Sequence, residues 1–512
     1  NKVARDSRLP MSMTVTATLN ITNSTGGAIN AINSNGNFGF KQYPLNRCIS
    51  TINHQINQAS TALNTNQLID SIARLNIFPE NADFYDNTQP DFVDSYLNAE
   101  QTNFNPLTSY VNTLAGDGVY KPRTLNYQVS GNSILANSTS NVVITATLYE
   151  PLISPFNSIG KDDERGLYGI DGEIINITWV NDLFNNMFAY ALPTGLTLNS
   201  ANVNLGSSST LYCVYLTPYD NFYQRIPNDS IYHYNSYSTF TQNVGAINAG
   251  QVLNGVTSPV CNFTNIPQKI LIYARLADGS RKCSTPDKYC LISNISAQWD
   301  NGAPQLAQAS TRQLYEISTR NGLVMPEPAF LQYNLTDPTS TSLYGCGSVV
   351  VLDPSIDLSV GSDKTNSSSG RYIFQITLNL TNKTATNFDN VTLFVVGIND
   401  AILERNGTQY RNYLVTLPDD AIMRAKDLES VDMNEYRRAL RNNMFLSGGG
   451  LSDLFKKAVA FGQKAYNIGK KAHDIYQANK EDIHKGIQTA KSAYETVQAL
   501  RGKGANIDYF YE

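Results

Sequence analysis

Charged side chains are scarce in this sequence. They make up 16% of the 512 residues, against roughly 25% in typical soluble domains, so the polar surface must consist mainly of uncharged Asn, Ser, Thr and Gln. Such a surface gives little electrostatic repulsion between copies of the chain and favours packing of one copy against another. The net charge of -5 argues against a protein that coats nucleic acid, because that function needs clustered positive charge. Any binding to nucleic acid through basic residues must be confined to a short segment of the chain.

Metal ligands are also few and poorly spaced. The chain has six cysteines and four histidines, without a C-x-x-C pair or zinc-finger spacing. We therefore expect no metal and no cofactor, and we expect most cysteines to be buried thiols. Cys283 and Cys290 could close a small loop in an oxidising compartment, and the sequence leaves the compartment open. The cysteines are Cys48, Cys213, Cys261, Cys283, Cys290 and Cys346, and the histidines are His54, His233, His473 and His484.

Membrane-spanning and catalytic patterns are missing as well. No apolar run approaches the ~20 residues that span a bilayer. The chain has no G-x-x-x-x-G-K-[ST] loop, no G-x-S-x-G elbow and no H-E-x-x-H helix. The acidic segment "GKDDERG", residues 160–166, favours a solvated loop over a cation site. The sequence names no catalytic residue, and we predict that the protein is not an enzyme.

The chain is rich in the period-2 alternation of β-strands. "MSMTVTATLNIT", Met11 to Thr22, alternates in the way that a half-buried strand does. Similar runs recur without helices between them, which favours antiparallel sandwiches or barrels over a parallel sheet. One short helix is expected in "TNQLIDSIARLNIF", residues 65–78. The other predicted strands lie at 50–60, 141–152, 173–183, 210–218, 268–276, 289–299, 348–353, 371–381 and 390–398.

The strands fall into two sets, each of the size of one eight-stranded jelly roll. We therefore predict a mainly β fold with two tandem jelly rolls, a short helix in the first and a helical C-terminal tail. The polar, aromatic segment 219–238 is expected to connect them, and Trp179 and Trp299 to be core or interface anchors. The predicted divisions are an N-terminal arm at 1–10, a first jelly roll at 11–225, a second at 226–425, a helix and Gly-rich hinge at 426–450, and an amphipathic tail at 451–512.

An ordered series of stretches resembles one protein family. In the first half they are "YPLNRCISTINHQINQASTALNTNQLIDSIARLN", "QPDFVDSY", "NPLTSY", "ATLYEPLISPFN" and "GLYGIDGEIINITWVNDL". In the second half they are "IPQKILIYARL" and "ISNISAQWDNGAPQLAQASTRQLYEISTRNG". Together they cover about Tyr43 to Asn399 and resemble the double jelly-roll major capsid proteins of virophages and Polinton-like double-stranded DNA viruses.

The resemblance implies a structural protein of a virion that is assembled inside a host cell. Three chains would form a homotrimer with six barrels and a pseudo-hexagonal outline, and such capsomers would tile an icosahedral shell around DNA. Neighbouring capsomers and minor or penton capsid proteins would be the partners. The segment "IDLSVGSDKTNSSSG", residues 356–370, is expected to be an exposed loop on the outer tower.

A glycine-rich break precedes the tail. Leu446, Ser447, Gly448 and Gly449, followed by Gly450, are similar to the site cut by adenovirus-type maturation proteases, which Polinton-like viruses and virophages commonly encode. An extended stretch without side chains suits a protease groove. The alternative is a plain flexible hinge, because glycine runs are common in linkers.

The tail itself predicts an amphipathic helix with a basic polar face. Three roles stay open: docking on a partner's apolar groove, binding to a membrane, or contact with viral DNA through the lysines. The apolar stripe includes Leu451, Leu454, Phe455, Phe461 and Ile468, and the lysines are Lys456, Lys457, Lys464, Lys470 and Lys471.

A secreted or surface β-sandwich adhesin that binds glycans or receptors is the alternative function. The chain contains several N-x-[ST] sequons, for example at Asn20, Asn176 and Asn262. A sequence rich in Asn and Thr produces sequons by chance, so they are weak support for glycosylation. An adhesin predicts occupied sequons and a disulfide, whereas a capsid protein predicts self-assembly.

Overall fold

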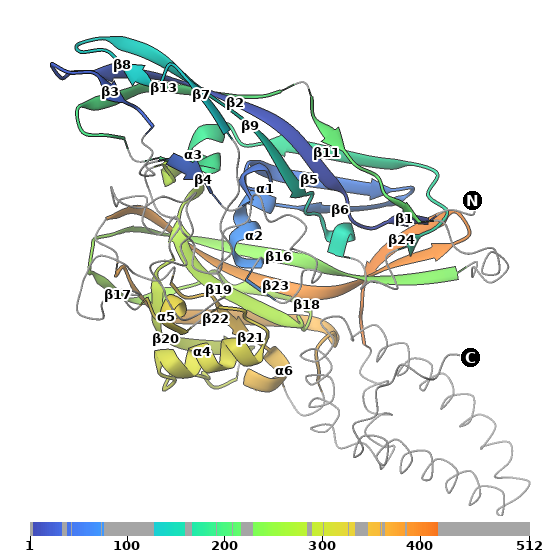
Figure 1. The fold of residues 1–512 in the computed structure, drawn as a ribbon. Helices are drawn as coiled ribbons and strands as arrows, with labels where there is room; N and C mark the ends of the chain where they lie inside the picture. Colours follow the sequence, from blue (N-terminus) through green and yellow to red (C-terminus); the bar gives the residue numbers. More distant parts are fainter. Residues whose placement is uncertain are drawn as a thin grey trace, which may run out of the picture. The chain divides into compact units, whose positions relative to one another are not determined.

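Antiparallel β-sheet makes up most of the described chain (Figure 1). The structure, a computed structural model, describes residues 4–32, 38–41, 43–72, 74–75, 127–158, 166–190, 192–206, 208–216, 229–283, 289–300, 302–325, 327–332, 347–358, 360, 364–383 and 387–417. All of them belong to the first of two units into which the chain divides, residues 1–449; the second unit, 450–512, lies outside them. The predicted mainly β class is confirmed.

Two main sheets form the first half. Its strands are β1 Ala4–Asp6, β2 Pro10–Asn23, β3 Ile29–Asn30, β4 Phe38–Phe40, β5 Ile49–Ile56, β6 Ala59–Leu63, β7 Tyr127–Ser130, β8 Ser133–Ile134, β9 Thr139–Pro151, β10 Gly166–Leu167, β11 Glu173–Trp179, β12 Phe188–Tyr190, β13 Leu196–Leu205, β14 Thr210–Leu211 and β15 Tyr215–Leu216. Sheet I has the order β13-β2-β9-β7, with β14 also paired to β2, and sheet II is β11-β5-β6. Three small sheets, β10-β1-β15, β12-β4 and β3-β8, complete this half.

Two further sheets form the second half. Its strands are β16 Asp229–Ile247, β17 Val252–Thr257, β18 Cys261–Asn265, β19 Lys269–Leu276, β20 Leu291–Trp299, β21 Val350–Leu352, β22 Ser369–Thr381, β23 Phe388–Asn406 and β24 Gln409–Leu414. Sheet III has the order β16-β23-β19-β21, with β24 paired to β23, and sheet IV is β17-β22-β18, with β20 paired to β22. Among the described strands, every named sheet draws its members from one half only.

Sheets III and IV face each other across an aromatic core. Phe240 of β16 meets Phe263 of β18 edge to face at 5.3 Å, and Trp299 of β20 stacks on the same Phe263 at 6.2 Å. Gly397 of β23 lies under this ring, where an added Cβ would stand 2.5 Å from a ring carbon. The glycine therefore lets the two sheets approach closely. Trp299 is buried and Trp179 packs against the core, as predicted.

The helices are short and lie between strands. They are α1 Pro44–Arg47, α2 Thr65–Ile72, α3 Leu183–Met187, α4 Thr311–Arg320, α5 Glu327–Phe330 and α6 Pro354–Asp357, with 3-10 turns η4 Pro155–Ser158 and η6 Asp278–Ser280. The predicted helix of the first half is confirmed as α2. The helix α4 was not predicted, although Ser310 and Gln313 form a capping box at its start, a signal that the sequence itself carries.

Two predicted segments have a different structure from the one expected. Residues 4–6 of the supposed arm form β1, with Arg5 buried. The supposed connector 219–238 contains the start of β16 at Asp229, and Tyr232 and Tyr234 of this strand are buried. Both segments looked like linkers because tyrosines and polar residues do not reveal burial at sequence level. The predicted boundary between 225 and 226 lies outside the described residues.

The expectation of an exposed loop at 356–370 is wrong for most of its described residues. The segment begins within α6, and buried positions continue after it. Serine and threonine in this stretch are buried because their polar groups find partners. The Ser368 hydroxyl, for example, accepts a hydrogen bond from the Thr365 backbone N–H at 2.8 Å. The buried residues are Leu358, Val360, Thr365, Ser367 and Ser368.

A buried carboxyl fixes α1 beneath sheet I. Glu150 of β9 accepts hydrogen bonds from the Leu45 N–H at 2.8 Å and from the Asn46 N–H at 3.1 Å. The Asn46 amide donates a third bond at 2.8 Å. Burial raises the pKa of Glu150 from 4.5 to about 7, although these bonds and Arg47 act in the opposite direction. The protonated form is therefore favoured in the folded chain relative to the unfolded chain.

We expect this carboxyl to make stability depend on pH. Because the folded-state pKa of Glu150 lies above its unfolded value, its contribution is complete below pH 4.5 and is lost as the pH rises through about 7. Glu150→Gln cannot titrate, so the fall in unfolding free energy over this interval should shrink by on the order of 2–3 kcal/mol. Denaturant unfolding at several pH values measures it.

In Glu150→Gln, the dependence of the unfolding free energy on pH should become weaker but should not vanish, because burial also raises the pKa of Asp353 to about 6. Glu316→Gln is the matched control, since Glu316 is an exposed glutamate of α4. It should keep the wild-type pH profile. An unchanged profile in Glu150→Gln would contradict the assignment.

Candidate functional site

A buried cluster of side chains joins the two halves. We call the region around it the seam. Phe156 of η4 meets Tyr234 of β16 edge to face at 5.0 Å. The hydroxyl of Tyr232 donates to the Gly166 carbonyl at 3.1 Å, and that of Tyr410 donates to the Tyr168 carbonyl. The cluster consists of Ile56, Ala59, Phe156 and Leu167 from the first half and Tyr232, Tyr234, Ala401, Leu403 and Tyr410 from the second.

Asn57 is the polar centre of this seam. It occupies the turn between β5 and β6 with φ 50°, a left-handed conformation that asparagine tolerates better than most residues. Its amide donates to the Gly169 carbonyl at 3.0 Å and to the Thr408 carbonyl of the second half at 2.7 Å. Its side-chain oxygen accepts from the N–H groups of Asp171 at 2.9 Å and Gly172 at 3.0 Å. One side chain therefore ties three loops together.

An ion network lies next to the seam. Glu173 of β11 pairs with Arg5 of β1 at 2.7 Å and contacts His54 of β5 at 2.7 Å. The other ring nitrogen of His54 lies 2.8 Å from the Ser154 hydroxyl. Burial lowers the pKa of His54, although Glu173 acts in the opposite direction, so the neutral ring is favoured. With both nitrogens engaged in the core, this histidine holds strands together.

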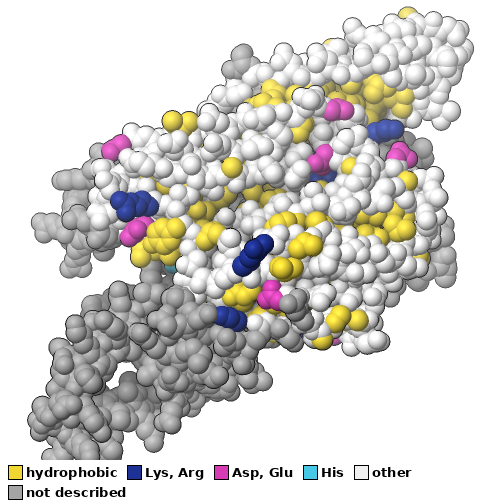
Figure 2. All heavy atoms as spheres, turned by 180° about the vertical axis from the view of Figure 1, so that it is seen from behind, with side chains coloured by type: hydrophobic (Ala, Val, Ile, Leu, Met, Phe, Trp, Pro, Cys, Tyr) yellow, Lys and Arg dark blue, Asp and Glu magenta, His cyan; other side chains and the backbone are white. Residues whose placement is uncertain are grey.

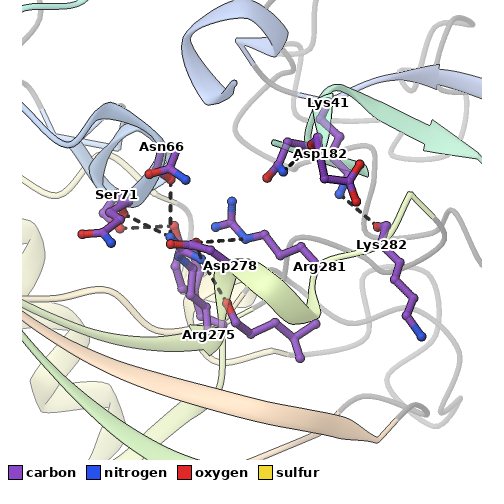
Figure 3. Close-up of polar contacts among 12 residues, drawn as sticks. Lys41, Asn66, Ser71, Asp182, Arg275, Asp278, Arg281 and Lys282 are labelled. Carbon is purple, nitrogen blue, oxygen red and sulfur yellow. Dashed lines mark hydrogen bonds and ion pairs between the residues drawn. The ribbon is translucent and has the colours of Figure 1, made fainter. Parts of the chain in front are cut away.

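The second region of contact between the halves joins α2 to β19. The Tyr273 hydroxyl donates to the Gln67 carbonyl at 2.9 Å, and the Arg275 guanidinium reaches the carbonyls of Asn66 and Gln67 at 3.4 Å each. Figure 3 shows Arg275 between α2 and Asp278, whose carboxylate it binds at 2.8 Å. Burial alone would raise the pKa of Asp278, but Arg275 and Arg281 outweigh it and the pKa is lowered.

None of the described cysteines is joined to another in a disulfide. Cys48, Cys261, Cys283 and Cys290 are buried, as predicted, and Cys213 is exposed. Burial raises the pKa of Cys261 and of Cys290 to about 12, which makes both thiols unreactive. Cys283 and Cys290 do not form a disulfide, which the sequence had left as a possibility.

Within the described part of the chain, no group of histidine, cysteine and acidic residues could hold a metal ion. No helix of this part is long and apolar enough to cross a membrane.

An exposed apolar strand edge stands out on the surface. Consecutive residues 211–215 are all exposed, and we call them the apolar edge. Their backbone is held, since the Tyr212 N–H donates to the Pro10 carbonyl and the Asp6 N–H donates to the Val214 carbonyl, each at 2.8 Å. Tyr215 is 66% exposed. Exposed apolar edges promote pairing with another chain, so this one is a candidate contact surface.

Charge is sparse on the surface of the described residues. On the face seen in Figure 2, the Lys, Arg, Asp and Glu side chains of described residues occupy a few small, scattered places. The predicted processing site at 446–450 and the amphipathic tail from Leu451 onward lie outside the described residues. The seam and the apolar edge were not predicted, because they depend on contacts between distant segments.

Family models match both halves of the chain. The model "Sputnik virophage major capsid protein 1st domain" matches residues 2–208, and "Major capsid protein V20 C-terminal domain" matches residues 234–401. A curated relative, "Putative capsid protein V20" of Sputnik virophage, is 24% identical over 472 residues, which cover 87% of this chain and 75% of the relative.

Solved structures show the same fold. The Sputnik virophage structure determined by cryo-EM contains a chain that matches with a TM-score of 0.67 and 22% identity, covering 85% of this chain and 88% of that one. The crystal structure of the mavirus major capsid protein matches with a TM-score of 0.65 and 17% identity, covering 82% and 86%.

The two fused β halves and these matches define a capsid protein with the double jelly-roll fold. The chain belongs to the virophage major capsid protein family. It is a structural component of the virion shell. The resemblance noted in the sequence is confirmed, and the adhesin alternative is not favoured.

We expect Asn57→Ala to destabilise the seam. The variant loses the four side-chain hydrogen bonds and places alanine at positive φ, so the unfolding free energy should fall by about 2–4 kcal/mol. Asn57→Gly loses the same bonds without the backbone strain and should cost about 1 kcal/mol less. Denaturant unfolding of both variants measures the difference.

Asn176→Ala is the control, because Asn176 is exposed on β11. It should stay within about 0.5 kcal/mol of the wild type. If Asn57→Ala unfolded at the wild-type midpoint, Asn57 would not be the centre of the seam.

Proposed function

We propose that the chain forms a homotrimer of six eight-stranded jelly rolls and that these pseudo-hexameric capsomers tile an icosahedral shell. Each half supplies two facing sheets, which suits one barrel per half. Minor or penton capsid proteins would complete the shell where six-fold packing ends.

The observation that carries this proposal is the seam. It joins the two halves by a buried cluster, by Asn57 and by the α2–β19 contacts. A rigid pair of similar barrels is what a trimer needs in order to present six nearly equivalent sides. A C3 ring also requires heterologous contacts that close, and an exposed apolar edge together with low charge favours such contacts.

The tail is proposed to be released or docked inside the shell. A maturation protease would cut after Gly449, in the sequence Leu446, Ser447, Gly448, Gly449, and free a peptide that begins at Gly450. The support is the sequence pattern alone. The freed or retained helix would dock its apolar stripe on a partner's groove, with binding to a membrane or to viral DNA as the other outcomes of the test.

The trimer predicts a definite particle size. Purified chain should have a native mass three times the 56.5 kDa of the monomer and should show hexagonal capsomers by electron microscopy. Native mass spectrometry at several concentrations checks this. A chain that stayed monomeric at micromolar concentration would contradict the proposal.

Processing predicts two products in mature particles. Intact-mass analysis should find a body that ends at Gly449 and a peptide that begins at Gly450. Gly449→Val should block the cut, because a side chain at this position fills space that a glycine-specific groove lacks, and Ser447→Ala is the control that should be cut normally.

A single uncut chain in every mature wild-type particle would remove the processing proposal. If the peptide is found, leakage of anionic vesicles would indicate membrane action, and its retention with packaged DNA would indicate DNA contact. Its retention on the capsid shell alone would support docking.

A further inference from the structure

The outer face of sheet I consists mainly of uncharged polar side chains, with Val143 of β9 as an apolar exception. On the central strand β2, inward residues are buried and the outward ones are half-buried. The outward residues of β2 are Ser12, Thr14, Thr16, Thr18, Asn20 and Thr22. The neighbouring strands continue the pattern with threonine, serine and asparagine, for example Thr145 and Thr147 on β9 and Asn202 on β13. None of the described outward positions of β2, β7, β9 and β13 carries Lys, Arg, Asp or Glu.

Hydrogen bonds across the strands fix these side chains. The Thr22 and Thr139 hydroxyls lie 2.7 Å apart, and the Asn20 amide donates to Asn141 at 2.8 Å. The Asn199 amide donates to both Asn20 and Thr22 at 2.8 Å. Because these bonded side chains satisfy one another and are held in place, covering them costs less rotamer entropy and less desolvation than covering free side chains.

An aromatic margin borders one end of the face. Tyr149, at the end of β9, and Tyr212, next to β14, contact each other edge to face at 6.1 Å. Tyr212 belongs to the apolar edge, residues 211–215. Protein interfaces are enriched in tyrosine and depleted of lysine, aspartate and glutamate. The face and the apolar edge together have this composition.

The chemistry of the face selects its partner. Nucleic acid and anionic lipid surfaces require positive charge, which the described outward positions of sheet I do not supply. A second copy of this chain presents neutral surfaces of the same kind. Sheet IV, for example, has Gln375, Thr377 and Asn379 at successive outward positions of β22. Two such surfaces can meet without like-charge repulsion and without burying an unpaired ion.

We propose that the outer face of sheet I, together with the apolar edge, is the surface on which a second copy of this chain packs. This inference rests on the proposed assembly into capsomers and deepens it by naming the contact surface. It explains why the chain can do without charge on a large, ordered sheet face, where a monomeric protein ordinarily places Lys and Glu.

Charge inserted into the face tests the proposal. Thr147 and Asn202 are exposed and lie on either side of β2, so Thr147→Lys/Asn202→Lys should fold normally and should weaken association of full-length chains at least about tenfold, because a buried unpaired charge is costly. Added salt should not rescue it fully, since salt does not remove the desolvation cost. Native mass spectrometry and electron microscopy measure trimers and shells separately.

Two variants serve as controls. Thr147→Ser/Asn202→Ser keeps the face neutral and should assemble like the wild type. Glu316→Lys/Thr319→Lys places two lysines on exposed positions of α4, a helix surface that already carries Arg312 and Arg320, and should also assemble. Thermal unfolding of each variant near the wild-type temperature shows that the fold is intact.

The outcomes separate this inference from the proposed function. Loss of trimers places the face inside the capsomer, and loss of shells with intact trimers places it between capsomers; both support the inference. Assembly of the sheet I lysine variant at wild-type strength overturns the inference while leaving the capsid role untouched. An equal loss of association in the α4 variant also overturns it, because the effect would then not depend on the face. A wild-type chain that never associates overturns the proposed trimer instead.

Discussion

The structure depends on one constraint: buried polar groups at the seam must find partners in the opposite half. A buried amide or carbonyl without a hydrogen bond costs about 1–3 kcal/mol, so neither half can complete its loops alone. The buried Arg275 guanidinium satisfies carbonyls of α2, and the half-buried Asn57 adds bonds to carbonyls of both halves at the margin of the seam. These bonds make two sandwiches with separate sheets into one unit, and a shell subunit needs that rigidity.

Charge is used sparingly and mostly where it is paired. Arg5 with Glu173 and Arg275 with Asp278 are ion pairs beside contacts between segments that are distant in the sequence, whereas the described outward positions of sheet I are neutral. Buried pairs of this kind favour one arrangement because separating either partner leaves an uncompensated charge. A neutral outer face, by contrast, permits close approach by a like surface. Charge is therefore placed in two different ways: ion pairs specify the contacts inside the chain, and the outer face of sheet I stays neutral so that another surface can approach it.

The fold is shared with solved capsid proteins at only 22% and 17% identity. Such divergence is tolerable because a sandwich needs apolar residues at alternate positions and not particular letters. Positions where backbone and side chain meet closely are less free. Gly397 beneath Phe263 is one, since any Cβ there would collide with the ring. Low identity outside such positions is therefore compatible with the same shell-building role.

Sequence alone determined strands such as β2, β9, β19 and β22, the helix α2, the two-part organisation and the family, because side-chain alternation and motif order are local properties of the chain. It did not predict β13, β17, β18 or β24. It misread residues 4–6, the start of β16 and the segment after α6, because burial of polar and aromatic residues depends on partners elsewhere. The predicted tail and processing site come from sequence only. The seam and the neutral face of sheet I were decided by tertiary structure. Asn57 and Thr408 are 351 positions apart, and no local pattern specifies that they meet.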